Sequence, residues 1–198
     1  MPDPLAVVLD SCVLVPSRLR DYLLSLAAAQ CYRPVWNDVI LGEVAWCERR
    51  RHEEFGLSRT KAHGMARRLI RQMTMVFDDS LVDGWDHLDG TFGLPDPNDE
   101  HVVATAVVAH APVIVTANLT HYPSSALPVG IQIVSPADFT ARIARAQPGA
   151  AVTALREMAA RLSNPAMSMS DLMDYFDSHY QMTETTALLR PWLSRRPG

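Results

Sequence analysis

The feature that most constrains the fold is a helix followed by a buried strand, in the stretch LPDPNDEHVVATAVVAHAPVIVTAN from Leu94 to Asn118. Valine and alanine recur at helical spacing, a proline then ends the helix, and V-I-V-T predicts a short buried strand. Asp96 and Asp99 stand at the entrance of the helix, and Asn118 follows the strand. Because ligands of open parallel sheets bind outside the carboxyl ends of the strands, this unit can bring Asp99 and Asn118 to one pocket.

Similar patterns occur along the rest of the chain. They predict strands at residues 5–10, 32–36 and 131–134, and helices at residues 16–30, 38–53, 58–73 and 136–146. Pro148-Gly149 indicates a boundary, and three amphipathic helices are expected in the roughly 50 residues beyond it. A segment of that size is too small for a sizeable core of its own, so we expect it to pack on the main domain or to bind a partner.

Composition limits the class of protein. The chain has 198 residues, of which 48% are hydrophobic and 20% charged, as in ordinary globular domains. The sequence contains no apolar run of the roughly 18 residues that a membrane span needs, and its first residues lack the basic region of a signal peptide. Three unclustered cysteines fit a reducing compartment better than a disulfide framework or a zinc site. We therefore expect a cytoplasmic protein without a membrane partner.

Charge is distributed unevenly. The net charge is −4, which does not by itself indicate a nucleic-acid partner. However, basic residues concentrate between residues 49 and 71, and acids concentrate between residues 78 and 100. Candidate phosphate-binding residues are Arg49, Arg50, Arg51, Arg67, Arg68 and Arg71. A basic face beside an acidic pocket suits a metal-dependent enzyme acting on a polyanion, and a merely solvated helix surface is the alternative.

One acid stands on the apolar side of a predicted helix. Ile40, Glu43, Val44 and Cys47 fall at i, i+3, i+4 and i+7, so Glu43 is expected on the buried stripe. A carboxylate in that position costs several kcal/mol unless it is paired or binds a metal. Glu43 is therefore a candidate functional residue, although an ordinary variation in the helix pattern would also produce it.

Together with Glu43, the acids at element ends form a candidate cation site. Asp10 follows the first strand, and Asp96 and Asp99 precede the central helix. Gathering several carboxylates is unfavourable unless a cation neutralises them, and Mg²⁺ or Mn²⁺ accepts such oxygen ligands. Local roles remain open for each acid. Asp10 and Asp96 can cap the following helices, the helix dipole can stabilise Asp99, and Asn118 can be a turn residue.

Histidine is not part of this predicted site. His101, His110 and His121 are interpreted as surface residues or as hydrogen-bonded core residues. The sequence also lacks the glycine-rich phosphate loops and the nucleophile elbow of other enzyme classes.

Four motifs in one order carry a resemblance to a known family. They are VVLDSCVLVP, ILGEV, LPDPNDEHVVATA and VTANLTHYP. Together they resemble the PIN domain, and more narrowly the VapC-type toxins of type II toxin–antitoxin pairs. The resemblance covers about residues 5–140, and the tail resembles a C-terminal helical extension of one branch. It implies an α/β fold of the PIN-like three-layer type, with a central, mostly parallel sheet of about four to five strands flanked by helices. The expected domains are a PIN-like nuclease domain at 1–147 and the extension at 148–198.

The resemblance also implies site residues. Asp10, Glu43 and Asp99 match the acids that hold the metal, and Asp96 matches an additional acid of this branch. Asn118 falls where many members have a fourth acid, and His121 falls where an aspartate is common. Both departures remove negative charge.

The implied activity is hydrolysis of RNA phosphodiester bonds by a metal-dependent endoribonuclease that uses Mg²⁺ or Mn²⁺. The implied partners are an RNA substrate, a cognate antitoxin and a second copy of the chain in a homodimer. Two alternatives stay open. One is an RNA-processing nuclease without toxin activity, and the other is a non-catalytic PIN-like module that binds RNA or protein.

Overall fold

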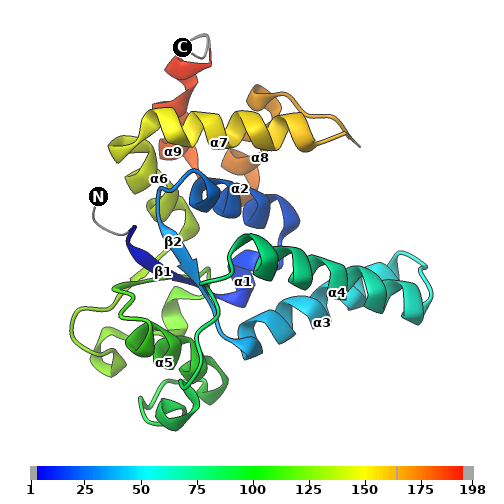
Figure 1. Ribbon diagram of the computed structural model, residues 1–198. Coiled ribbons are helices and arrows are strands. Elements are labelled where there is room, and N and C mark those ends of the chain that lie inside the picture. The colour runs from blue at the N-terminus through cyan, green and yellow to red at the C-terminus, as the bar shows by residue number, and fades with distance from the viewer. Residues whose placement is uncertain (1–3, 164, 194–198) are drawn as a thin grey trace. The chain divides into compact units, whose positions relative to one another are not determined.

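The computed structural model describes residues 4–163 and 165–193, which divide into two compact units (Figure 1). The sheet unit consists of Ala6–Pro16 and Pro34–Ile133. The helical unit takes in the described residues of Met1–Leu5, Ser17–Arg33 and Val134–Gly198. Every candidate site residue predicted above belongs to the sheet unit.

The sheet has four strands in the order β2-β1-β3-β4. They are β1 (Ala6–Leu9), β2 (Arg33–Val35), β3 (Val113–Val115) and β4 (Gln132–Val134). β1 and β3 are parallel neighbours, with Val7 opposite Val113 and Leu9 opposite Val115. Every residue of these two strands is buried. This confirms the predicted parallel sheet flanked by helices, and the pairing brings the carboxyl ends of β1 and β3 to the same edge.

Helices complete the sheet unit. They are α1 (Ser11–Leu14), α3 (Asp38–Glu54), α4 (Arg59–Val76) and α5 (Glu100–Val108), with short 3₁₀ helices at Asp86–Leu88, Pro97–Asp99, Leu119–His121 and Ser124–Ala126. α5 packs against β1 and β3, and its first seven residues are all buried. α3 and α4 form a helical hairpin and lie side by side (Figure 1).

Two polar residues cap the entrances of helical segments. The Asn37 side chain accepts a hydrogen bond from the N–H of Ile40 and caps α3. Asp96 accepts one from the N–H of Asn98 and caps the 3₁₀ turn that leads into α5. α4 continues to Val76, three residues beyond the predicted end of the helix at residue 73.

The helical unit contains α2 (Ser17–Ala28), α6 (Pro136–Ala146), α7 (Pro148–Arg161), α8 (Met169–Tyr180), α9 (Thr183–Leu189) and a 3₁₀ turn at Arg190–Trp192. α2 packs against α7, and the Tyr22 and Phe176 rings stack with their centroids 5.1 Å apart. Ser168 and Asp171 form a capping box at the start of α8. The helix break predicted at Asn164-Pro165 falls partly on Asn164, which lies outside the described residues. The domain boundary at residues 147 and 148 stays a prediction.

Within residues 4–163 and 165–193, no helix combines the length and apolar character that crossing a bilayer requires.

Candidate functional site

A pocket at the carboxyl edge of the sheet collects four of the five predicted site residues. Asp10, Glu43, Asp99 and Asn118 line it, together with Ser11, Val39, Gly42, Trp46 and Cys47. The strand ends supply Asp10 and Asn118, α3 supplies Glu43, and the turn before α5 supplies Asp99. The fifth residue, Asp96, is not among the lining residues but lies beside Asp99.

Asp10 is held at the end of β1 by the neighbouring strand. Its backbone N–H donates to the carbonyl of Val115, and its Oδ2 accepts hydrogen bonds from Thr116 Oγ1 at 2.7 Å and Cys12 Sγ at 3.2 Å. The side chain does not cap α1, the alternative role that the sequence left open. Asp10 is buried, yet its Oδ1 has no hydrogen bond in the part of the chain that the structure describes. That oxygen is therefore left to bind a ligand.

The groups around Asp10 stay protonated at neutral pH. Burial and the Asp10 charge raise the pKa of Cys12 to about 12. Burial, followed by the Asp10 and Asp99 charges, raises the pKa of Tyr122, whose hydroxyl lies 3.5 Å from Asp10 Oδ2. Both groups remain hydrogen-bond donors to one side of the carboxylate, which fixes its orientation toward the pocket.

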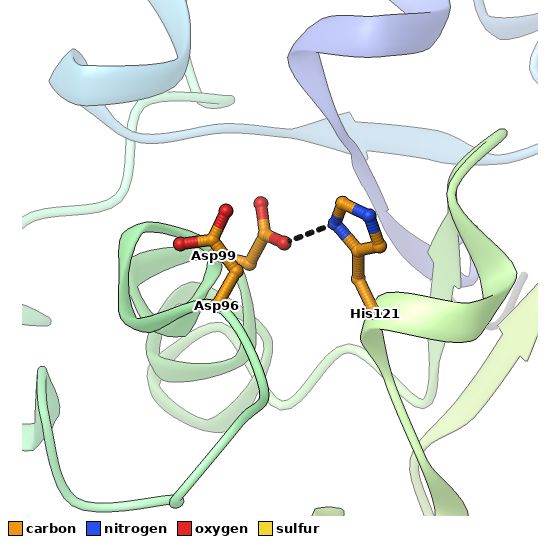
Figure 2. A group of neighbouring side chains, drawn as sticks. All are labelled: Asp96, Asp99 and His121. Atoms are coloured by element: carbon orange, nitrogen blue, oxygen red, sulfur yellow. Dashed lines mark hydrogen bonds and ion pairs between the residues drawn. The ribbon is translucent and has the colours of Figure 1, made fainter.

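Asp99 forms a second carboxylate position with Asp96 and His121. His121 Nδ1 and Asp99 Oδ2 are 2.7 Å apart and share a hydrogen bond, drawn as a dashed line in Figure 2. One ligand atom from each of Asp96, Asp99 and His121 lies within 4.8 Å of the others. Burial raises the pKa of Asp99, and the Asp10 and Asp96 charges add to the rise against the lowering effect of His121. The local charge is thus incompletely neutralised by the protein's own residues.

The environment of Glu43 differs from the predicted one. Its side chain is 43% exposed instead of lying on the buried stripe, because the pocket opens beside this part of α3. The acid buried on α3 is Glu48, which pairs with Arg51 at 2.7 Å and His52 at 3.5 Å. Burial raises the pKa of Glu43, but hydrogen bonds from His101 and Ser11 outweigh it and leave the pKa lowered. Glu43 is therefore ionised and faces the pocket.

A buried histidine stands behind Glu43. His101 Nε2 lies 3.8 Å from Glu43 Oε1, and its Nδ1 lies 3.2 Å from the amide nitrogen of Asn37. Asn37 in turn donates to Thr105 Oγ1 at 2.9 Å. Because the Asn37 amide is a donor, Nδ1 of His101 must accept, and Nε2 then carries the proton that faces Glu43. This arrangement sets the orientation of the glutamate.

The donor set fits a divalent cation. Asp10 offers a free oxygen, Asp99 lies beside the second carboxylate of Asp96, and Glu43 is ionised. Oxygen ligands of this kind suit Mg²⁺, and a site that also includes His121 nitrogen suits Mn²⁺. The predicted ligands Asp10, Asp99 and Glu43 share one pocket, whereas the tightest group of possible ligand atoms is Asp96, Asp99 and His121.

The predicted RNA-binding arginines fall into two groups. Arg49, Arg50 and Arg51 on α3 form ion pairs with Glu53, Glu54 and Glu48. On α4, the candidate arginines are exposed and form no ion pair within the described ranges. These residues are Arg67, Arg68 and Arg71. α4 contains no acidic residue from Arg59 to Val76, so its surface is the less neutralised of the two.

Some residues that shape the site were missed by the sequence analysis. Thr116 holds Asp10 and accepts a hydrogen bond from the N–H of Asn118 at 3.0 Å. His101 and His121 were interpreted as surface or core residues, but they contact Glu43 and Asp99. For Thr116 the available signal was its place at the end of the strand, two residues before Asn118.

Comparisons with known proteins support the same interpretation. The PIN domain family model matches residues 6–120, and the VapC50 C-terminal domain model matches residues 136–191. No curated protein and no solved structure matches the chain. The first match spans more than half of the chain and includes Asp10, Glu43, Asp96, Asp99 and Asn118. The chain therefore belongs to the PIN domain family, among the VapC-type members that carry a helical C-terminal domain.

Proposed function

We propose that the protein is a metal-dependent endoribonuclease toxin of the VapC type, which a cognate antitoxin neutralises. The observation that carries the proposal is the pocket at the carboxyl edge of the sheet, where Asp10, Glu43, Asp99 and Asn118 meet. The two family matches supply the rest of the support.

The proposed cofactor is Mg²⁺ or Mn²⁺, held by Asp10 and Asp99 with Glu43 direct or through water. When bound, the ion lowers the pKa of water and neutralises charge on the phosphoryl group. Glu43, kept ionised by His101 and Ser11, accepts a hydrogen bond from the attacking water and orients it. Asp96 is a second candidate for that role. The Asn118 amide is placed at the pocket to donate to a phosphate oxygen.

The proposed substrate is single-stranded RNA. Because water is the nucleophile, the reaction does not use the ribose 2′-hydroxyl, and preference for RNA arises from contacts to that group. The exposed arginines of α4 are the better candidates for phosphate contacts, since those of α3 would first have to leave Glu48, Glu53 and Glu54.

The proposed partners are an antitoxin and a second copy of the chain, in the cytoplasm. The match of residues 136–191 to the VapC50 C-terminal domain supports this branch of the family. As a proposal, the helices of that region supply part of the antitoxin or dimer surface.

The test combines RNA cleavage with calorimetric titration of Mn²⁺ and Mg²⁺. Wild type should bind metal and cleave RNA. Asp99→Asn should lose both metal binding and RNA cleavage while keeping the circular dichroism spectrum of wild type. Asp83→Asn is the matched control, because it removes the same charge from an exposed residue of the same unit. Cleavage by folded Asp99→Asn at the wild-type rate would contradict the proposed site.

Expression in a bacterial host separates toxin from processing nuclease. Growth arrest that depends on Asp99 supports the toxin, whereas harmless expression of a protein that cleaves RNA in vitro would favour an RNA-processing enzyme. Failure of properly folded wild type to bind either metal would favour the non-catalytic module.

A further inference from the structure

One aromatic side chain lines the acidic pocket but belongs neither to the proposed metal ligands nor to the residues that orient water. Trp46 lies on α3, one turn after Glu43, and lines the same pocket as Asp10 and Asp99. Its side chain is 50% exposed. Its indole N–H has no hydrogen bond within residues 4–163 and 165–193. By contrast, Trp36 is fully buried and Trp85 donates to Asp38 at 3.2 Å.

The residues one turn after and one turn before Trp46 on α3 differ in size and charge. At i+4, the Arg50 guanidinium lies over the indole, with Cζ 4.8 Å from the ring centroid. At i−4 stands Gly42, where an added Cβ would meet no atom within 4 Å. Side chains on a helix lean toward its N-terminus, which is the direction of Gly42 from Trp46. The indole has a planar cation over one face, and Gly42, one turn before it, leaves open space in the pocket that both residues line.

Packing gives no reason for glycine at this position. Glycine is a poor helix former in a helix interior, and no close contact at Gly42 excludes a side chain. What a side chain would occupy is the space beside Trp46 within the pocket. A ligand that stacks on the indole uses the same space.

We propose that Trp46, Arg50 and Gly42 form a nucleobase-stacking subsite that holds one base of single-stranded RNA beside the scissile phosphate. This inference rests on the proposed function. Every base has a flat π-face that stacks on an aromatic ring, and unpaired bases in RNA are free to do so. The Arg50 guanidinium lies over the ring and stabilises it from one side, and Arg50 also pairs with Glu54 at 3.4 Å.

The surroundings of Trp46 favour RNA over an apolar protein segment. An aliphatic side chain would use only the face of the indole. A nucleotide offers a flat base to the indole and a phosphate to a cation held by Asp10, Glu43 and Asp99. The subsite thus matches both parts of one nucleotide.

The test measures binding of a short fluorescent single-stranded RNA by anisotropy, in the Asp99→Asn background so that cleavage does not interfere. Trp46→Leu should weaken binding roughly 5- to 100-fold, the range of one base-stacking contact. Trp46→Phe should retain most of the affinity. Phe55→Leu, on an aromatic residue 77% exposed near the end of the same helix, is the matched control and should have no effect.

Two further variants separate stacking from a structural effect. Gly42→Leu should preserve or raise the melting temperature while weakening RNA binding, because leucine favours the helix but fills the stacking space. In a series of RNAs with one abasic site each, the Asp99→Asn parent should bind more weakly when the abasic site stands at one particular position. The variant that also carries Trp46→Leu should show no such dependence on position.

Failure of the stacking subsite can be distinguished from failure of the proposed nuclease activity. Equal RNA affinity for Trp46→Leu and the Asp99→Asn parent overturns the subsite. Absence of cleavage by wild type counts against the nuclease activity, while the binding measurement still decides whether Trp46 stacks a base.

Discussion

His121 Nδ1 lies 2.7 Å from Asp99 Oδ2, which places an imidazole beside the carboxylates of the candidate metal site. Mg²⁺ is bound almost entirely through oxygen, whereas Mn²⁺ also accepts imidazole. The residue at this position therefore bears on which ion the protein prefers.

The first prediction concerns that preference. His121→Asp should raise affinity for Mg²⁺ relative to Mn²⁺ by about tenfold, because it replaces a nitrogen donor with an oxygen donor. Calorimetric titration of both ions into the same preparation measures the ratio of the two dissociation constants. Asp83→Asn is the control for the surface charge. An unchanged ratio in His121→Asp would show that His121 does not take part in metal binding.

The second prediction concerns His101 as a positioning residue for Glu43. Gln can place its amide nitrogen near the position of the imidazole Nε2 and still donate to Glu43, whereas Asn reaches only the position of Nδ1. We expect His101→Gln to retain most of kcat and His101→Asn to lose about 10- to 100-fold, with similar KM. Equal losses in both variants, with melting temperatures lowered in parallel, would assign His101 a structural role alone.

The parts of the site that sequence predicted are those with local signals. Asp10 and Asn118 follow buried strands, and Asp96 has the spacing of a cap. The contacts that orient them join distant residues. Thr116 and Asp10 are separated by 106 positions, and Asn37 and His101 by 64. No pattern within a helix or strand specifies such pairs, because they depend on how the strands align in the sheet.

The ion pairs of the α3 arginines were not predicted, although their spacing was visible in the sequence. Arg49 and Glu53, like Arg50 and Glu54, have the i, i+4 spacing that favours ion pairs on a helix. That spacing was present in the sequence, and it distinguishes α3 from α4, which has no acid between Arg59 and Val76. The exposure of Glu43 could not be found in the same way, since the pocket beside it is formed by residues far away in the chain.

The third prediction uses Glu100, the first residue of α5. Its carboxylate accepts backbone hydrogen bonds from Phe92, Gly93 and Leu94, which hold the preceding loop. The Phe92 contact is the largest cause of its lowered pKa. Glu100→Gln should reduce the free energy of unfolding by about 1.5–3 kcal/mol at neutral pH.

The pH dependence of that difference has a definite sign. Since the folded pKa of Glu100 lies below its ordinary value of 4.5, its stabilisation is complete above pH 4.5 and is lost as the pH falls through the folded pKa. Urea unfolding of wild type and Glu100→Gln across this range should therefore show a difference that shrinks with acidity. Glu54→Gln, exposed on α3, should show none. A constant difference at all pH values would contradict the role of the charge.

The fourth prediction concerns the helical unit. Tyr22 of α2 stacks on Phe176 of α8, and both side chains are almost completely buried. Phe176→Ala should cost roughly 3–5 kcal/mol of stability, against about 0.5 kcal/mol for the exposed Phe55→Ala. Deleting residues 149–198 would also remove α7, against which α2 packs, so the truncated chain should aggregate. A soluble, cooperatively folding truncation would show that α2 does not need these helices.

The fifth prediction tests whether α4 binds the RNA backbone. Each phosphate contact to a single strand contributes about 0.7 to the slope of log affinity against log salt concentration. Arg67→Gln with Arg71→Gln should therefore lower the slope by about 1.4, measured by anisotropy in the Asp99→Asn background. Arg145→Gln with Arg190→Gln removes the same charge from arginines that already pair with Glu184 and Asp174, and should leave the slope unchanged. If both double variants changed the slope equally, net charge alone would explain the effect. A loss confined to the α4 variant would assign phosphate contacts to that helix, because Arg67 and Arg71, unlike Arg145 and Arg190, have no acidic partner within the described chain.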